Sequence, residues 1–111
     1  ADELASLVIA GKKRATCGSF ASYQAEERPV TPGAVHIVLN GAGEAVCVIR
    51  TLSLRLIRFN EMSAELAALE GEGDLSLAYW QQAHQAFFAR EGSWSPDMEL
   101  VFEEFAVIEV A

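Results

Sequence analysis

A short basic segment near the start of the chain carries side chains that could do chemistry. Residues 11–16 read Gly-Lys-Lys-Arg-Ala-Thr, so three cations follow a glycine and a threonine ends the segment. A lysine at a pocket mouth holds a phosphate as a cation, or acts as a base if burial lowers its pKa. A threonine hydroxyl is a nucleophile only beside a base. Lys13 and Thr16 are therefore candidate catalytic residues, and Lys12 and Arg14 are candidate phosphate contacts; the simplest alternative is a solvated, capped helix end.

The backbone between Lys13 and Thr16 decides whether the two side chains can act together. A helical turn would place residues three apart on one face, whereas an extended strand would point them in opposite directions. The spacing alone leaves both arrangements open.

Acidic side chains that could complete a site occur in two later segments. Residues 70–73 read Glu-Gly-Glu-Gly, so either Glu70 or Glu72 could face a pocket, with a solvated acidic loop as the alternative. Glu103 shares a strand face with Val101 and Phe105, which makes it either an edge charge or a pocket acid held by a cation. The sequence does not choose among the three acids.

The remaining polar and aromatic residues have simpler interpretations. One helical stripe predicts a core face, with His84 as a buried, hydrogen-bonded histidine; its members are Leu77, Trp80, His84, Phe87 and Phe88. Cys17 and Cys47 lack metal-ligand spacing, so we expect two reduced thiols, with one disulfide as the alternative. No metal or cofactor is expected. Loop aromatics are the better candidates for stacking on a base, namely Phe20, Tyr23 and Trp94.

The elements that must position these residues alternate between helices and strands. Helices are expected from the N-terminus to a C-cap at Gly11, over residues 60–69, and from Asp74 or Ser76 to about Glu91. Strands are expected over residues 17–23, 35–39, 45–58 and 99–110, with a hairpin turn at residues 40–43. Apolar residues on both faces of 45–58 indicate a strand bent through a closed sheet. The order lacks a regular βαβ rhythm, so the fold class is α+β.

Composition bounds the domain count and the partners. The 111 residues, 51% of them apolar, predict one domain over residues 1–111. A net charge of −8 disfavours duplex DNA, whereas a small basic mouth suits a nucleoside or single-stranded RNA. No apolar run approaches the ~20 residues of a membrane span, and nothing resembles a signal peptide. A cytoplasmic location is expected, and the absence of an initial Met suggests a trimmed chain.

Several motifs in one order resemble a known family. The pattern Gly11-x-Lys13-x-x-Thr16 is similar to the GxKxxT signature of ASCH domains, members of the PUA-like superfamily. The rest of the resemblance to the bacterial branch lies in residues 70–77, Tyr79-Trp80, His84, Phe87-Phe88 and residues 100–105. The resemblance implies a small PUA-like β-barrel of mixed strands flanked by helices. It also implies a bend near Arg14-Ala15 that brings Lys13 and Thr16 into one pocket.

In amidohydrolase members of that family, the matching lysine and threonine act with a glutamate to deacetylate a nucleoside. The resemblance therefore assigns catalysis to Lys13, Thr16 and Glu70. Candidate substrate-binding residues are Lys12, Arg14, Arg50, Glu72 and Glu103. Many members have an arginine where this chain has Gly18, so Arg50, Arg55 or Arg58 would have to replace that contact.

Three functions fit these observations. The leading hypothesis is an amide hydrolase that acts on a modified nucleoside such as N4-acetylcytidine. The alternatives are a ribonuclease with the same basic cleft and a non-catalytic module that binds RNA or a modified base. The sequence does not indicate an oligomeric state.

Overall fold

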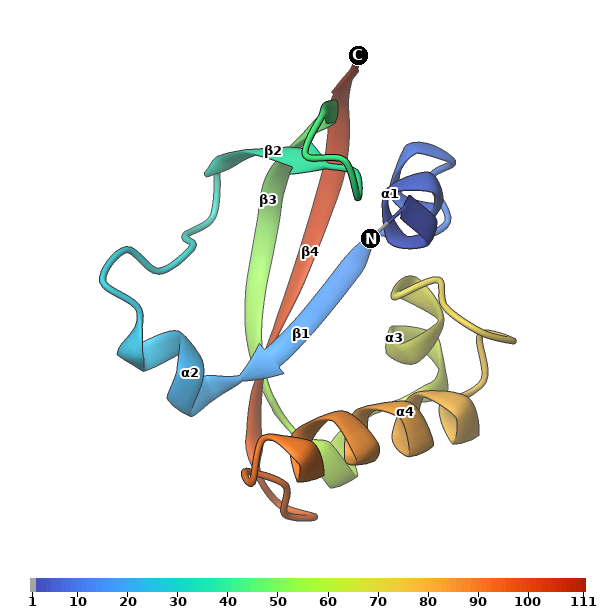
Figure 1. Ribbon diagram of the computed structural model, residues 1–111. Coiled ribbons are helices and arrows are strands. Elements are labelled where there is room, and N and C mark those ends of the chain that lie inside the picture. Colours follow the sequence, from blue (N-terminus) through green and yellow to red (C-terminus); the bar gives the residue numbers. More distant parts are fainter. Residues whose placement is uncertain (1) are drawn as a thin grey trace.

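A single antiparallel sheet, curled into a half-barrel, organises the computed structural model, which describes residues 2–111. The strand order is β1-β4-β3-β2, and the strands are β1 (Ala15–Ser19), β2 (Val35–Leu39), β3 (Ala45–Arg58) and β4 (Glu99–Val110). The helices are α1 (Asp2–Ile9), α2 (Phe20–Ala25), α3 (Ala64–Leu69) and α4 (Leu77–Arg90), with a 3₁₀ turn, η1 (Phe59–Glu61). The predicted α+β fold is confirmed. In Figure 1, α1, α3 and α4 lie on one side of the long strands, and α2 lies on the other.

The long strand β3 bends as its sequence pattern predicts, but the expected closed sheet is instead a half-barrel whose outer strands, β1 and β2, do not pair with each other in the described residues. The pairing of β3 with β4 shifts register between Val48 and Ile49 and again between Thr51 and Ser53. The first shift leaves an extra residue, Ile108, in β4, and the second leaves an extra residue, Leu52, in β3. A bulge sharpens the local twist, and the one at Leu52 also changes which side chains of β3 face inward, so apolar residues occur on both faces of this strand.

The chain leaves α1 through a glycine turn and enters β1. Gly11 has a φ of +74°, and its N–H donates to the Val8 carbonyl at 3.0 Å. This left-handed position is the predicted helix C-cap, which glycine fills without strain. Arg14 N–H then donates to the Leu69 carbonyl at 2.8 Å, so the segment before β1 lies against the end of α3.

Two expected elements differ from the structure. The strand expected over residues 17–23 is present only as far as Ser19, where β1 ends; the Ser19 hydroxyl accepts a hydrogen bond from Ser22 N–H at 2.9 Å and starts α2. The helix expected over residues 60–69 is divided into η1 and α3, and Ser63 caps α3. In both cases a serine cap starts a helix of six residues or fewer, which hydrophobic periodicity cannot reveal in so short a segment.

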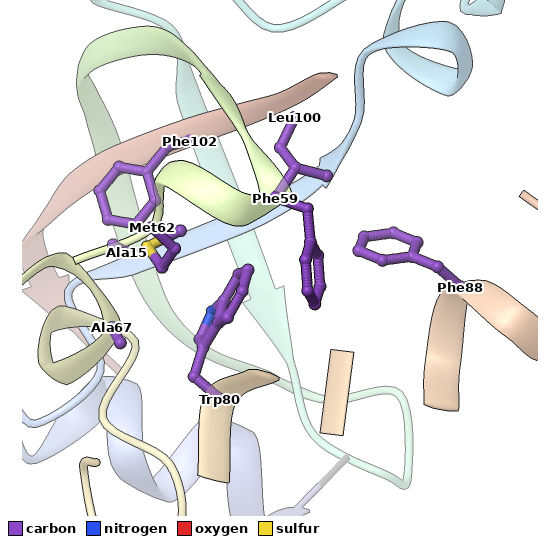
Figure 2. Packing of buried hydrophobic residues seen from close by; sticks show 8 residues of the cluster. All are labelled: Ala15, Phe59, Met62, Ala67, Trp80, Phe88, Leu100 and Phe102. Carbon is purple, nitrogen blue, oxygen red and sulfur yellow. The ribbon is translucent and has the colours of Figure 1, made fainter. Parts of the chain in front are cut away.

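The main core lies between the sheet and helices α3 and α4. Its buried residues are Ala15, Phe59, Met62, Ala67, Trp80, Phe88, Leu100 and Phe102. Figure 2 shows Trp80 and Phe88 projecting from α4 towards Phe59, and the Phe59 and Trp80 ring centroids are 5.1 Å apart. Phe87 was expected in this core but is 47% exposed, because it lies on the outer side of α4. None of the described helices is long and apolar enough to cross a membrane.

Candidate functional site

The strand β1 divides the motif residues between two faces of the sheet. Its register pairs Cys17 with Phe102 of the main core, and pairs the next residue along, Thr16, with Glu103. Successive side chains of a strand point to opposite faces. Cys17 therefore faces α3 and α4, and Thr16 faces away from them. The expected bend that would bring Thr16 to Lys13 is wrong, because the chain is already extended from Ala15 onward.

Lys13 is held by both glutamates of the acidic loop. Its Nζ donates to Glu72 Oε2 at 2.9 Å and to the Glu70 carbonyl at 3.2 Å, and lies 3.6 Å from Glu70 Oε1. The Lys13 and Glu70 side chains are only 8% and 3% exposed, whereas that of Glu72 is 33% exposed. Both candidate glutamates of this loop therefore contact Lys13, and Glu70 is the more buried of the two.

Glycine in the acidic loop allows this close approach. Gly71 has a φ of +71°, and a Cβ there would lie 2.7 Å from Lys13 Cα and closer still to the Lys12 carbonyl. A side chain at this position would both strain the backbone and push the loop away from the lysine segment. The Glu-Gly repeat thus brings Glu70 and Glu72 against the start of β1.

Three further side chains contact the Glu70 carboxylate. Its Oε2 accepts a hydrogen bond from Trp80 Nε1 and lies 3.4 Å from His84 Nε2 and 3.6 Å from Cys17 Sγ. The other His84 nitrogen, Nδ1, lies 2.9 Å from the Trp80 carbonyl, which can only accept, so Nδ1 carries a proton. We call Lys13, Cys17, Glu70, Trp80 and His84 the Glu70 cluster.

The charges of the Glu70 cluster stabilise one another. Burial on its own would raise the pKa of Glu70, but hydrogen bonding and charge from His84, with Lys13 and Trp80, hold it below its usual value. Burial would lower the pKa of His84, but Glu70 raises it above its usual value. Burial, with Glu70 adding to it, raises the pKa of the Cys17 thiol strongly. Cys17 is therefore a neutral thiol here and a poor nucleophile.

Thr16 lies in a separate cavity on the opposite face. This cavity has a volume of about 250 Å³, and we call it the Thr16 cavity; its walls include Thr16, Ser19, Ser22, Tyr23, Glu26, Val30, Leu54, Val101 and Glu103. Glu103 Oε2 accepts a hydrogen bond from Thr51 Oγ1 at 2.7 Å, which orients the carboxylate. Tyr23 is fixed by a 2.6 Å hydrogen bond from its hydroxyl to the Val30 carbonyl. No lysine or arginine of the described residues lines this cavity.

The predicted phosphate contacts lie outside the Thr16 cavity. Lys12 and Arg14 are exposed, and Arg14 lines a second cavity of about 410 Å³ between α1 and the sheet. Arg50 is exposed on β3, where it pairs with Val35 and Ala106, and it lines neither cavity. The geometry therefore does not support the prediction that Arg50 makes the contact of the arginine that many family members have at the position of Gly18.

Three residues that contact Glu70 or Glu103 were not predicted as site residues from the sequence. Cys17 and His84 were assigned simple structural roles, and Thr51 was not considered. Cys17 lies two residues past Ala15 on the face that begins at Lys13, so strand alternation could have linked Cys17 to the lysine. No local signal joins Thr51 to Glu103: in the sheet Thr51 pairs with Phe105 and Glu103 with Leu54, and the Thr51–Glu103 hydrogen bond forms beside the bulge between Thr51 and Ser53.

Comparisons with known proteins agree with this fold. The family model of the ASCH domain matches residues 1–109. The ASCH domain from Lactobacillus crispatus JV V101 is 38% identical, with a TM-score of 0.90 over 96% of this chain and 71% of that one. Protein EF3133 from Enterococcus faecalis V583 is 33% identical, with a TM-score of 0.86 over 99% of this chain and 72% of that one. A search of curated proteins finds no match.

The chain belongs to the ASCH domain family. ASCH domains are in general RNA-binding domains with a PUA-like fold. The resemblance seen in the sequence motifs is confirmed, and it extends over nearly the whole chain.

Proposed function

We propose that this domain binds a modified nucleoside, free or within single-stranded RNA, and hydrolyses an amide on its base, as in N4-acetylcytidine. The observation that carries the proposal is the pairing of Thr16 with Glu103 in the wall of the Thr16 cavity. Directly paired residues on neighbouring strands have Cβ atoms about 4.5–5.5 Å apart. A hydroxyl and a carboxylate at that separation can share a proton directly or through one water.

The arrangement has the parts of an activated nucleophile. Glu103, oriented by Thr51, takes the proton from the Thr16 hydroxyl as that oxygen attacks the acetyl carbonyl. The protonated Glu103 then gives its proton to the departing exocyclic amine. Water, activated by the same carboxylate, cleaves the resulting ester and releases acetate. The step needs no group beyond the substrate and water.

The walls of the Thr16 cavity suit a base rather than a phosphate. Two carboxylates, Glu26 and Glu103, line the cavity with hydroxyl groups and apolar side chains, and they would repel an anion. The exposed cations Lys12 and Arg14 stand just before β1, where a sugar-phosphate chain leaving the cavity could be contacted. The proposal thus assigns recognition of the base to residues inside the Thr16 cavity. Contact with the sugar-phosphate backbone is assigned to Lys12 and Arg14 outside it.

The sequence-based set of Lys13, Thr16 and Glu70 makes a competing proposal. Its support is the nearly buried Lys13, which contacts two carboxylates in the acidic loop. In our proposal Lys13 and Glu70 instead position the start of β1. The two proposals assign the chemistry to opposite faces of the same strand, so they predict different variants to be inactive.

The experiment compares matched variants on acetylcytidine and on acetylated single-stranded RNA, with deacetylation measured by chromatography. Thr16→Val keeps the shape of the side chain, and Glu103→Gln keeps its size. We expect each to lower kcat about 10²–10⁴-fold, the usual value of a positioned acid or base. Lys13→Arg should retain kcat at a temperature where its fold is intact. Full activity of Thr16→Val together with inactive Lys13→Arg would move the chemistry to the Lys13 face.

The same assay also tests whether this domain only binds RNA, which is the general function of the family. RNA binding by a protein that deacetylates neither substrate would make this domain a binding module. Shortened RNA products would instead support the ribonuclease alternative. Thr16→Val should then be compared for binding, because removal of one hydroxyl from a pocket wall weakens base recognition without removing the exposed cations.

A further inference from the structure

On the helix-covered face of β1, we propose that Cys17, Glu70 and His84 bind one transition-metal ion, for which zinc is the best match. A thiol sulfur, a carboxylate oxygen and an imidazole nitrogen from these residues lie within 4.8 Å of one another. They come from β1, from the loop after α3, and from α4, so the tertiary fold assembles them. This site lies across the strand from Thr16 and is independent of the proposed hydrolysis.

The separations of Cys17 and His84 from Glu70 fit metal coordination, and all three ligand atoms lie within 4.8 Å of one another. Zinc binds sulfur at about 2.3 Å and nitrogen or oxygen at about 2.0–2.2 Å, so tetrahedral ligands lie roughly 3.3–3.7 Å apart. The structure places Cys17 Sγ 3.6 Å and His84 Nε2 3.4 Å from Glu70 Oε2. Charge-assisted N–H···O bonds are shorter, at about 2.7–2.9 Å. The 3.4 Å separation of His84 Nε2 from Glu70 Oε2 is long for a direct hydrogen bond and lies within the range for two ligands of one ion.

Three side chains also crowd one carboxylate oxygen. Trp80 Nε1, His84 Nε2 and Cys17 Sγ all approach Glu70 Oε2. A carboxylate oxygen has two lone pairs, and the Trp80 and Cys17 donors occupy both, so His84 Nε2 approaches an atom whose accepting positions are already taken. A metal ion relieves that crowding: the Cys17 proton passes to solvent, the lone pair of His84 Nε2 and the Cys17 sulfur bind the ion, and Oε2 keeps the Trp80 bond and gains the ion.

The surrounding contacts already orient the ligands for an ion. Nδ1–H of His84 donates to the Trp80 carbonyl at 2.9 Å, which turns Nε2 towards Glu70 and fixes the tautomer that metals need. Lys13 Nζ lies 3.6 Å from the other oxygen of Glu70 and offsets the negative charge of the ligands. The high pKa of the Cys17 thiol belongs to the metal-free cluster, because a coordinating thiol is deprotonated by the ion.

Space for a fourth ligand lies beside the set. A cavity of about 20 Å³ is bordered by Glu70, Trp80 and His84, and a cavity needs only about 10–15 Å³ to hold one water. Thiolate with imidazole and one carboxylate favours zinc over magnesium or calcium, which prefer oxygen ligands. The sequence alone predicted no metal site, because the ligands have no characteristic spacing.

The test is a cobalt titration of untagged protein that has been stripped with EDTA and reduced with a thiol-free reductant. We expect one equivalent of Co²⁺ to produce a thiolate-to-cobalt charge-transfer band and the visible bands of a tetrahedral ion. Zn²⁺ should abolish both. Cys17→Ser should lose the charge-transfer band and weaken Zn²⁺ binding more than about 100-fold, since even outer contacts are worth about 10–100-fold.

Matched variants make the result decisive. Cys47→Ser should behave as wild type, because Cys47 is buried in a different cluster with Val8 and Phe105. Glu72→Gln should also bind the ion, because it removes a contact to Lys13 but no ligand atom. If Cys17→Ser does not fold, His84→Gln provides the same comparison. Absence of saturable Co²⁺ binding, or a band that persists in Cys17→Ser, overturns the proposal.

Discussion

A carboxylate lies on each face of β1, and the two differ in burial and in the number of side chains that contact them. On the helix-covered face, Glu70 is 3% exposed and is approached by Lys13, Cys17, Trp80 and His84. On the other face, Glu103 has one side-chain hydrogen bond among the described residues, from Thr51, and borders a cavity. A buried charge is tolerated only with partners, and those partners leave it little capacity for a substrate. In our proposal for hydrolysis, Glu103, the carboxylate with fewer partners, is therefore the one that acts on the substrate.

The largest expected effect is the difference in lost folding stability between variants of the two carboxylates. Glu70→Gln removes the charge that compensates Lys13 and His84, and breaking a buried ion pair from one side costs about 3–5 kcal/mol. Glu103→Gln should cost about 1 kcal/mol or less, because an amide oxygen can still accept from Thr51. Urea unfolding in the presence of EDTA measures both without any metal contribution. Equal losses would show that the two faces do not differ in this way.

A second comparison uses two glycines, Gly71 of the acidic loop and Gly18 of β1. Gly71→Ala places a Cβ against Lys13 Cα and the Lys12 carbonyl at a φ of +71°, and we expect a loss of about 1–3 kcal/mol. Gly18→Ala meets no atom within 4 Å and should change stability by about 0.5–1 kcal/mol in the favourable direction. Thermal unfolding of both variants gives the values. A tolerated Gly71→Ala would mean that the acidic loop is not held against β1.

The smallest effect concerns the exposed cations near β1. Single-stranded RNA binding should weaken as salt rises, with a log–log slope that reflects only a few phosphates, at about 0.7 per contact. Lys12→Glu should weaken binding and reduce that slope by about one contact. Arg90→Glu, an equal charge change in the last turn of α4, is the control and should leave the slope unchanged. Fluorescence anisotropy at several salt concentrations measures it, and a salt-independent affinity would contradict phosphate contact.

The sequence by itself determined the local features of this protein. The Gly11 cap, the Ser76 cap of α4 and the hairpin turn after β2 follow from single residues and their immediate neighbours. The alternation of helices and strands was enough for the α+β class, and the motif order was enough for the family. These features depend on interactions within a few residues, which is why they can be read without the fold.

Only the tertiary structure decided which motif residues meet. Because side chains alternate along a strand, the position at which β1 becomes extended sends Thr16 to one face and Cys17 to the other. Packing of the acidic loop on that strand, made possible by Gly71, brought Glu70 to Lys13. The α4 helix brought His84 to the same carboxylate. The fold determines which side chains contact a buried charge, and those that contact Glu70 come from residues distant in sequence.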